Sequence, residues 1–210
     1  MFFSILKFIL WPIFRLFLYP YKIINKENLI QDGNTIIVSN HLGKADVIYT
    51  AYIFKGKSIY LAKKEWFDNK FLGFWLKLIG AVSVDREGVD IKAIKTVLKS
   101  LKDDKRVIVF PEGTRNKESL DLLPLKDGPG YFAHKCNSTI LPITIANRPK
   151  MFRKNYIYIG EPIKLDNIEK KFSAEVNEEI TNIIRDALLD CREKVDIYLE
   201  NKKKKKWVKL

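Results

Sequence analysis

A histidine and an aspartate five residues apart form a candidate catalytic pair. His41 ends the segment TIIVSNH, and Asp46 follows in the segment LGKAD. Five residues turn through about 140° on a regular helix, so these two side chains can meet only across a turn, which Gly43 would ease. Asp46 would then hold one ring nitrogen of His41 and leave the other free to accept a proton. The alternative is a helix-capping aspartate beside an ordinary histidine.

A second polar cluster follows the apolar run RVIVF. Pro111 ends that run, because proline cannot donate a hydrogen bond to a neighbouring strand, and Gly113 permits a close approach to the backbone. Arg115 offers a planar set of donors that suits phosphate, and Glu112 could orient that arginine or a hydroxyl group. The alternative is an ordinary Pro-Glu-Gly turn followed by a surface arginine.

The elements that must position these residues alternate between strand-like and helical patterns. Strands are predicted at 35–40, 58–62, 81–85, 106–110, 138–146 and 156–160, and helices at 46–54, 65–79, 89–102 and from about 173 to 200. This alternation predicts one α/β domain with a largely parallel central sheet flanked by helices. Ligands bind such sheets at the carboxyl ends of strands, where His41, Lys63, Lys64, Arg86 and residues 111–115 are expected.

The absence of several well-known sequence motifs excludes some classes of enzyme. The chain has no GxSxG, Walker or HExxH motif, and its two cysteines, Cys136 and Cys191, have no metal-site spacing. We therefore expect neither a metal nor a cofactor. Cys136 with His134 or His41 is an alternative nucleophile, although a structural cysteine is the more common case. The simplest reaction left for a histidine and aspartate pair is deprotonation of a substrate hydroxyl group, which then attacks an activated acyl group such as a thioester.

The positive charge lies mainly at the two ends of the chain. The net charge is +13, and residues 1–26 and 201–210 contain four and six cations, respectively, with no acid. The body at 27–200 is nearly balanced, which disfavours a nucleic-acid binder, because such proteins carry a basic surface on the fold itself. Basic ends on a balanced body indicate an anionic membrane surface as the partner.

Both ends have features of membrane-contacting segments. Residues 1–26 are apolar and aromatic, but charges and two prolines interrupt them, so we expect an amphipathic helical segment that lies in the membrane interface. The alternative is a helix packed on the core of the domain. Residues 201–210, NKKKKKWVKL, are expected to form a polybasic tail, which either contacts anionic lipid or is simply solvated. The segment 27–200 between them, in which acidic and basic residues nearly balance, would be the catalytic domain.

These blocks resemble those of the bacterial 1-acyl-sn-glycerol-3-phosphate acyltransferases, a family of glycerolipid acyltransferases. Asn40, His41 and Asp46 are similar to the NHxxxxD motif of that family, and residues 110–115 to its FPEGTR motif. The intervening stretch AKKEWFDNKFLGFWLKLIGAVSVDR resembles the block that separates the two motifs. The later segments TILPITIA and YIGEPI also resemble segments of the family. Two positions depart from the family pattern, namely Gly43, where a small hydroxyl residue is frequent, and Lys70, where a proline is frequent.

The resemblance implies an O-acyltransferase that makes phosphatidic acid from 1-acyl-glycerol-3-phosphate. In that case His41 is the general base and Asp46 its orienting partner, while Glu112, Gly113, Thr114 and Arg115 bind the glycerol phosphate, assisted by the residues Arg86, Lys63 and Lys64. The acyl donor would be acyl-CoA or an acyl-carrier protein, and the enzyme would work as a peripheral or monotopic protein at the cytoplasmic face of the cell membrane. The alternatives are another lysolipid acceptor, such as a lyso-ornithine lipid, or a peripheral membrane-binding protein without activity.

Overall fold

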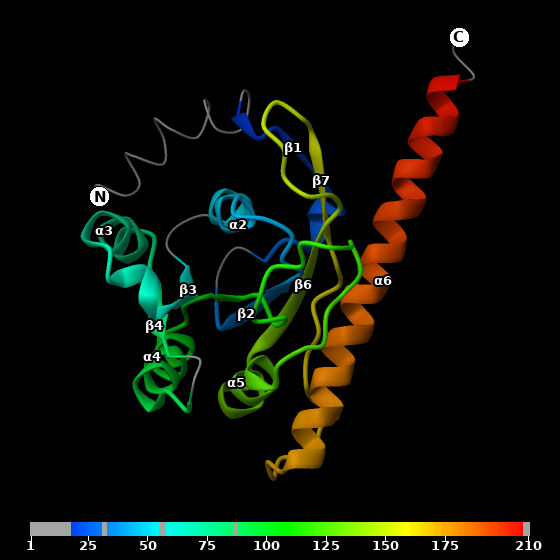
Figure 1. Ribbon diagram of the computed structural model, residues 1–210. Coiled ribbons are helices and arrows are strands. Elements are labelled where there is room, and N and C mark those ends of the chain that lie inside the picture. Colours follow the sequence, from blue (N-terminus) through cyan, green and yellow to red (C-terminus); the bar gives the residue numbers. More distant parts are fainter. Residues whose placement is uncertain (1–17, 31–32, 55–57, 86–87, 208–210) are drawn as a thin grey trace.

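A seven-stranded sheet runs through the middle of the molecule (Figure 1). The structure, a computed structural model, describes residues 18–30, 33–54, 58–85 and 88–207. The strands are β1 (Tyr21–Ile24), β2 (Thr35–Ser39), β3 (Ile59–Lys63), β4 (Ala81–Val84), β5 (Val107–Val109), β6 (Thr139–Ile145) and β7 (Asn155–Ile159). Their order across the sheet is β1-β7-β6-β2-β5-β3-β4. β6 and β7 are antiparallel and the other neighbouring pairs are parallel, so the predicted α/β fold with a largely parallel sheet is confirmed.

Helices cover both faces of this sheet. They are α2 (Asp46–Ile53), α3 (Lys70–Leu78), α4 (Ile91–Lys102), α5 (Gly128–Cys136) and α6 (Ala174–Trp207), with short 3₁₀ turns η2 (Lys26–Asn28) and η3 (Lys64–Phe67). Side chains that alternate along a strand point to opposite faces. Ile36 and Val38 of β2 accordingly pack in the cluster formed with α4, α5 and α6, whereas Ile37 packs in the cluster formed with α2. Both faces of β2 are therefore buried, which explains its uninterrupted apolar sequence.

Local sequence signals explain where two of these helices begin. The side chain of Asn69 accepts a hydrogen bond from the backbone N–H of Leu72 at the start of α3. Asp90 does the same for Ala93 at the start of α4. Each cap provides a partner for one of the free N–H groups in the first helical turn.

Two terminal elements differ from the sequence-based expectation. Residues 21–24, assigned above to the helical segment 1–26, form β1 and pair in parallel with β7, so they belong to the domain. Residues 1–17 of that expected segment lie outside the described residues. The final helix, expected to end near 200, continues to Trp207, because lysine is a good helix former and Lys202 donates a hydrogen bond to the hydroxyl group of Tyr156.

Gly80 joins α3 to β4 in a backbone conformation that other residues rarely adopt. Its φ is +88°, and a Cβ atom there would overlap the carbonyl oxygen of Ser58. We predict that Gly80→Ala lowers the free energy of unfolding by about 2 to 4 kcal/mol, because an unfavourable left-handed conformation adds to a steric clash with the backbone. Urea denaturation measures the change.

Gly88→Ala is the matched control, since a Cβ atom at Gly88 meets no atom within 4 Å. It is expected to leave the unfolding free energy within about 0.5 kcal/mol of that of the unchanged chain. Equal stability of the two variants would contradict the role assigned to Gly80.

Candidate active site

The predicted turn between His41 and Asp46 is present, and it joins the two side chains. Nδ1 of His41 lies 2.8 Å from Oδ2 of Asp46, the first residue of α2. A carboxylate accepts hydrogen bonds, so Nδ1 carries the ring proton and Nε2 keeps a free lone pair. Asp46 is fully buried, with 0% of its surface exposed, whereas the imidazole of His41 keeps 12% of its surface exposed. The pair therefore has the arrangement of a general base and its orienting acid.

The same carboxylate oxygen also shapes the loop between the two residues. Oδ2 of Asp46 accepts hydrogen bonds from the backbone N–H groups of Leu42 at 2.6 Å and Gly43 at 2.7 Å. The oxygen thus lies at the centre of the turn and fixes both the backbone and the imidazole. Asp46 is thus not the helix cap that the sequence left open as an alternative: the N-cap of α2 is Ala45, and the Asp46 carboxylate bonds to the turn that precedes the helix.

Gly43 is required by a close approach to a neighbouring loop. A Cβ atom at this position would lie 2.8 Å from Cδ of Pro149, in the loop that follows β6. Real Cβ atoms almost never come so close to another heavy atom, so a larger residue would have to displace Pro149. The departure from the family pattern at Gly43 therefore has a local steric cause.

Asn40 ties the histidine to the sheet. Its side-chain amide donates to the carbonyl of Ile145 at 3.0 Å and its side-chain oxygen accepts from the N–H of Ile145 at 2.8 Å. This reciprocal pair fastens the end of β2 to the end of β6, its parallel neighbour. From the sequence, Asn40 was identified only as part of a motif. An amide side chain directly after an apolar strand is the signal that could have identified its role.

Glu112 braces the catalytic loop from the second motif. Its Oε1 accepts a hydrogen bond from the backbone N–H of His41 at 2.7 Å, and its Oε2 accepts one from Leu123 at 3.1 Å. The side chain is buried, and burial raises the pKa of its carboxyl group, although both N–H groups and His41 oppose that rise. Both oxygens of Glu112 therefore bond to backbone amides, rather than to Arg115 or a hydroxyl group as the sequence suggested.

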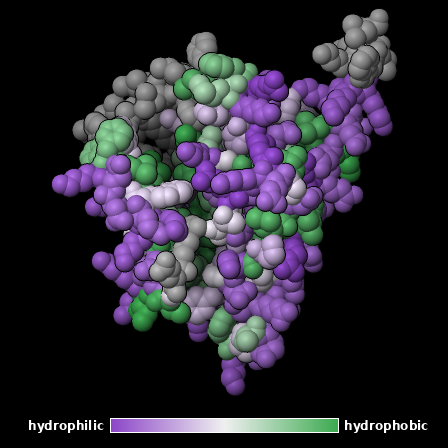
Figure 2. Space-filling view, in the orientation of Figure 1, coloured by the Kyte–Doolittle hydropathy of each residue, from purple (hydrophilic) through white to green (hydrophobic). Residues whose placement is uncertain are grey.

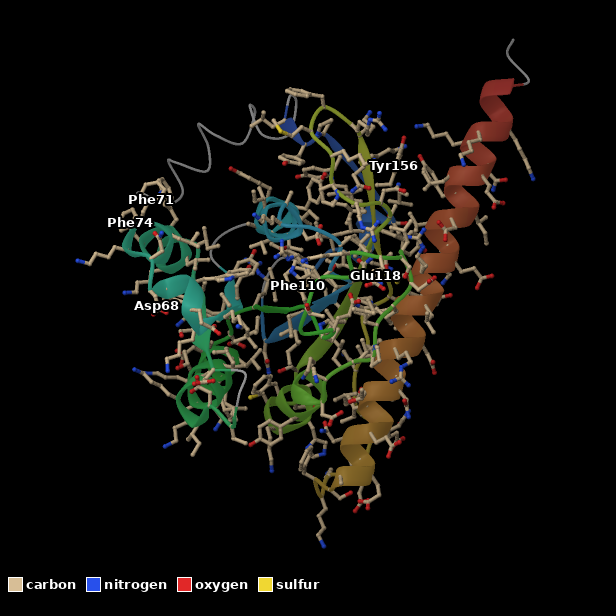
Figure 3. The ribbon with its side chains drawn as sticks, viewed as in Figure 1. Asp68, Phe71, Phe74, Phe110, Glu118 and Tyr156 are labelled. Carbon is tan, nitrogen blue, oxygen red and sulfur yellow. The ribbon has the colours of Figure 1, made fainter. Side chains whose placement is uncertain are left out.

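Phe110, in the second motif, and Asn116, directly after it, both contact the histidine. The ring of Phe110 stacks on that of His41, with centroids 4.2 Å apart, and lies near the centre of the molecule (Figure 3). The N–H of Asn116 donates to the carbonyl of His41 at 2.8 Å. The side chain of Asn116 is buried and forms hydrogen bonds with Glu118, Ser119 and Asp121, and these bonds fix the conformation of the loop that follows the second motif. Neither Phe110 nor Asn116 was predicted as a site residue.

His41 opens onto a large, mainly apolar cavity. The cavity has a volume of about 570 Å³, a size typical of ligand sites. Figure 2 shows hydrophobic atoms in a recess on this face of the molecule. Gly113, with a φ of +67°, and Lys126 contribute to the same wall as His41. Apolar lining comes from β3, α3, β4, α4 and α5, through Leu61, Leu76, Val84, Val97 and Phe132 among others.

The predicted phosphate-binding residues are only partly brought together. Thr114 is exposed and Arg115 partly exposed, next to Gly113 in the loop around His41. Lys63 and Lys64 lie at the carboxyl end of β3, as expected, but there they form ion pairs with Glu65 and, at 3.5 Å, Asp85. None of these four predicted residues lines the cavity, which takes its lysine from Lys126 instead. Arg86 lies outside the described residues.

The alternative chemistry has little support in the described part of the chain. Both cysteines are free, and burial raises the pKa of the Cys136 thiol, whose sulfur contacts the carbonyl of Leu98. His134 bonds through Nε2 to the carbonyl of Glu169. Among the described residues, no group of three or more His, Cys, Asp or Glu side chains is placed to hold a metal ion. None of the helices in the described part of the chain combines the length and the apolar character that a membrane span requires.

Known proteins share sequence and fold with this chain. The model of a family described as Acyltransferase matches residues 21–146, which is more than half of the chain. The 1-acyl-sn-glycerol-3-phosphate acyltransferase of Bacillus subtilis is 34% identical over 181 residues, covering 83% of this chain and 89% of that protein. The enzyme of the same name from Streptococcus pneumoniae is also 34% identical, over 74% of this chain, but the match spans only 59% of its own length.

A solved structure extends the likeness to the fold. The crystal structure of the 1-acyl-sn-glycerophosphate acyltransferase PlsC from Thermotoga maritima superposes with a TM-score of 0.65 at 21% identity, covering 90% of this chain and 79% of that one. The family match includes β1 to β6 and both motifs around His41. The chain belongs to the acyltransferase family.

Proposed function

We propose that the protein is a 1-acylglycerol-3-phosphate O-acyltransferase, which moves an acyl group from a thioester to the sn-2 hydroxyl group of its acceptor and forms phosphatidic acid. The main support for the proposal is the position of the His41 imidazole, which bonds to Asp46 through Nδ1 and lines an apolar cavity. The names of the Bacillus subtilis and Streptococcus pneumoniae relatives support the choice of acceptor. Acyl-CoA or an acyl-carrier protein would be the donor, and no cofactor is needed.

His41 is the general base in this mechanism. Nε2 removes the proton of the sn-2 hydroxyl group as its oxygen attacks the thioester carbonyl, and a tetrahedral intermediate forms. The intermediate collapses with cleavage of the carbon–sulfur bond, and the imidazolium returns the proton to the departing thiolate. Asp46 stabilises the imidazolium that exists between these steps, through its hydrogen bond to Nδ1. The apolar cavity takes an acyl chain, since burial of each methylene group contributes about 0.8 kcal/mol.

Cationic and backbone groups near His41 bind the acceptor phosphate. Gly113, Thr114 and Arg115 supply close backbone approach, a hydroxyl group and a planar donor set in the loop that bonds to the backbone of His41 through Asn116. Arg86, Lys63 and Lys64 are further proposed contacts, although the last two must leave their acidic partners in order to reach phosphate. The enzyme would act at the cytoplasmic face of the cell membrane, where acceptor and product are lipids.

Removal of the base tests the mechanism directly. We predict that His41→Ala lowers kcat by about 100-fold to 10,000-fold, the range that general-base catalysis contributes, with little change in folding. The assay follows labelled acyl groups from acyl-CoA to 1-acyl-glycerol-3-phosphate, and circular dichroism checks the fold. His134→Ala, which alters the other histidine of the chain, is the control and keeps activity. Retained activity in His41→Ala would remove His41 from the mechanism.

Arg115→Ala is predicted to act mainly on acceptor binding. Loss of a charge-assisted hydrogen bond to phosphate raises the acceptor KM by about 10-fold to 100-fold, at roughly 1.5 to 3 kcal/mol for each such bond. Steady-state kinetics with varied acceptor concentration measures the KM of the variant and of the unchanged chain. Lys117→Ala removes an exposed cation two residues away and serves as the control. Unchanged kinetic constants for the phosphate acceptor in Arg115→Ala would refute the assignment.

Glu112→Gln separates positioning of the base from binding of the acceptor. The amide keeps the shape of the carboxylate, but its NH₂ group cannot accept a hydrogen bond from a backbone N–H, so one of the two bonds, to His41 or to Leu123, is lost and the link between the two loops weakens. We expect kcat to fall about 10-fold or more while the acceptor KM stays within about twofold, because a misplaced base slows the chemical step. A rise in KM at constant kcat would show instead that Glu112 binds the acceptor.

A panel of lysolipids then decides between the acceptors. The proposal requires faster acylation of 1-acyl-glycerol-3-phosphate than of a lyso-ornithine lipid or an uncharged lysolipid. Preference for another acceptor would keep the acyltransferase mechanism and change the product. Binding to vesicles without transfer to any acceptor would favour the inactive membrane-binding alternative.

A further inference from the structure

The loop between β6 and β7 ends in two apolar side chains that face solvent. Within the segment 147–154, Met151 is 49% exposed and Phe152 is 70% exposed. Phe152 has a φ of +61°, a left-handed conformation that is unfavourable for an aromatic residue. An aromatic residue that is mostly exposed and in a strained conformation gains little from packing inside the protein, which favours a contact with a partner outside it.

The base of this loop is firmly held, so its tip projects in a defined way. Asn155 donates from Nδ2 to the carbonyl of Asn147 at 2.6 Å and accepts at Oδ1 from the N–H of Asn147 at 3.1 Å. The N–H of Phe152 donates to the carbonyl of Leu18 at 2.8 Å, and that of Arg153 to the carbonyl of Lys150 at 3.2 Å. The exposure of the tip is therefore a property of an ordered loop.

Cations surround the apolar tip. Lys150, Arg153 and Lys154 are exposed, and the segment 147–154 contains no acidic residue. Together with Arg148 they border a cavity of about 370 Å³ at the base of the tip, whose full lining is Leu120, Asn147, Arg148, Lys150, Arg153, Lys154 and Asn155. Four cations without a carboxylate make a site that suits a phosphate-bearing headgroup.

α3 presents a second exposed apolar face. Phe71 and Phe74, three residues apart on one side of the helix, are 75% and 58% exposed and point away from the domain in Figure 3. Lys70 and Lys77 lie at the two ends of the helix and are exposed. Leu76, by contrast, is buried and lines the cavity of His41. The helix thus separates solvent from the cavity proposed for the acyl chain.

Both features lie on one side of the molecule. In Figure 1 the β6–β7 loop is at the top and α3 lies on the left, in the upper half of the view; the lysine-rich end of α6 also reaches the top, whereas α4 lies below α3 at the lower left. The loop also contacts the catalytic turn, through Pro149 and Gly43. A surface that docks at the loop tip would therefore lie close to the catalytic histidine.

We infer that the tip of the β6–β7 loop and the exposed face of α3 form a membrane-docking surface that inserts Met151, Phe152, Phe71 and Phe74 into an anionic lipid bilayer. Aromatic side chains favour the membrane interface, and lysine or arginine beside them binds anionic headgroups. Such contacts reach about 5 to 10 Å into the boundary between headgroups and acyl chains. The inference concerns binding alone, so it stands or falls independently of the proposed reaction.

Site-directed fluorescence tests this surface. Phe152→Cys and Phe71→Cys are each labelled in the full chain with an environment-sensitive fluorophore and mixed with vesicles of phosphatidylcholine and phosphatidylglycerol. We expect a blue shift at both positions and at least twofold quenching by lipids that carry a nitroxide on the acyl chain. The unsubstituted chain, treated with the same reagent, gives the background from Cys136 and Cys191.

Ile91→Cys is the matched control, because Ile91 is 61% exposed and begins α4 on the lower side of the molecule. Its label should be neither shifted nor quenched. An unquenched label at residue 152 on vesicle-bound protein would overturn the inference, and quenching at 152 without quenching at 71 would overturn the part assigned to α3.

Charge reversal tests the choice of partner. Replacement of Lys150, Arg153 and Lys154 by glutamate should weaken binding to anionic vesicles by about tenfold or more, because each cation near the surface contributes to attraction. The same change at Lys92, Lys95 and Lys99, three exposed lysines of α4, should leave binding within about twofold. If quenching of the label at residue 152 survives reversal in the loop, anionic lipid does not bind through these cations, and their assignment to the membrane is wrong.

Discussion

A single buried carboxylate oxygen organises the candidate active site. Oδ2 of Asp46 receives hydrogen bonds from two successive backbone amides and lies against Nδ1 of His41, all within 2.6 to 2.8 Å. Charged acceptors make stronger hydrogen bonds than neutral ones, and the cost of leaving buried donors unpaired is high. The turn and the imidazole orientation are therefore determined together. A change at this oxygen would disturb the shape of the loop as well as the orientation of the imidazole.

The sheet supplies the second constraint. β2 and β5 are parallel neighbours, so the loops after them emerge at the same edge, and Glu112 can reach the backbone of His41 from 71 residues away. Asn40 makes the corresponding connection to β6 on the other side. The histidine is thus held by two strands adjacent to its own. Such support from rigid elements is what keeps a general base within reach of a bound hydroxyl group.

The sequence predicted those features that depend on local spacing. The strand and helix alternation, the turn between His41 and Asp46 and the convergence of His41 with the loop at 111–115 all follow from short-range patterns and the rule for parallel sheets. The partners of Glu112 and Lys63 could not be predicted, because strand order and side-chain pairing depend on tertiary packing. β1 was not predicted for a related reason. Its four residues continue the apolar run at the start of the chain, and only their pairing with β7 makes them a strand.

The close approach of Gly43 to Pro149 has an evolutionary consequence. Two loops that follow different strands meet there at van der Waals distance, with no space for a side chain at residue 43. A descendant that gained serine at that position would need a smaller or displaced residue at 149 at the same time. The two positions should therefore be inherited as a matched pair, with glycine opposite proline and larger residues opposite smaller ones.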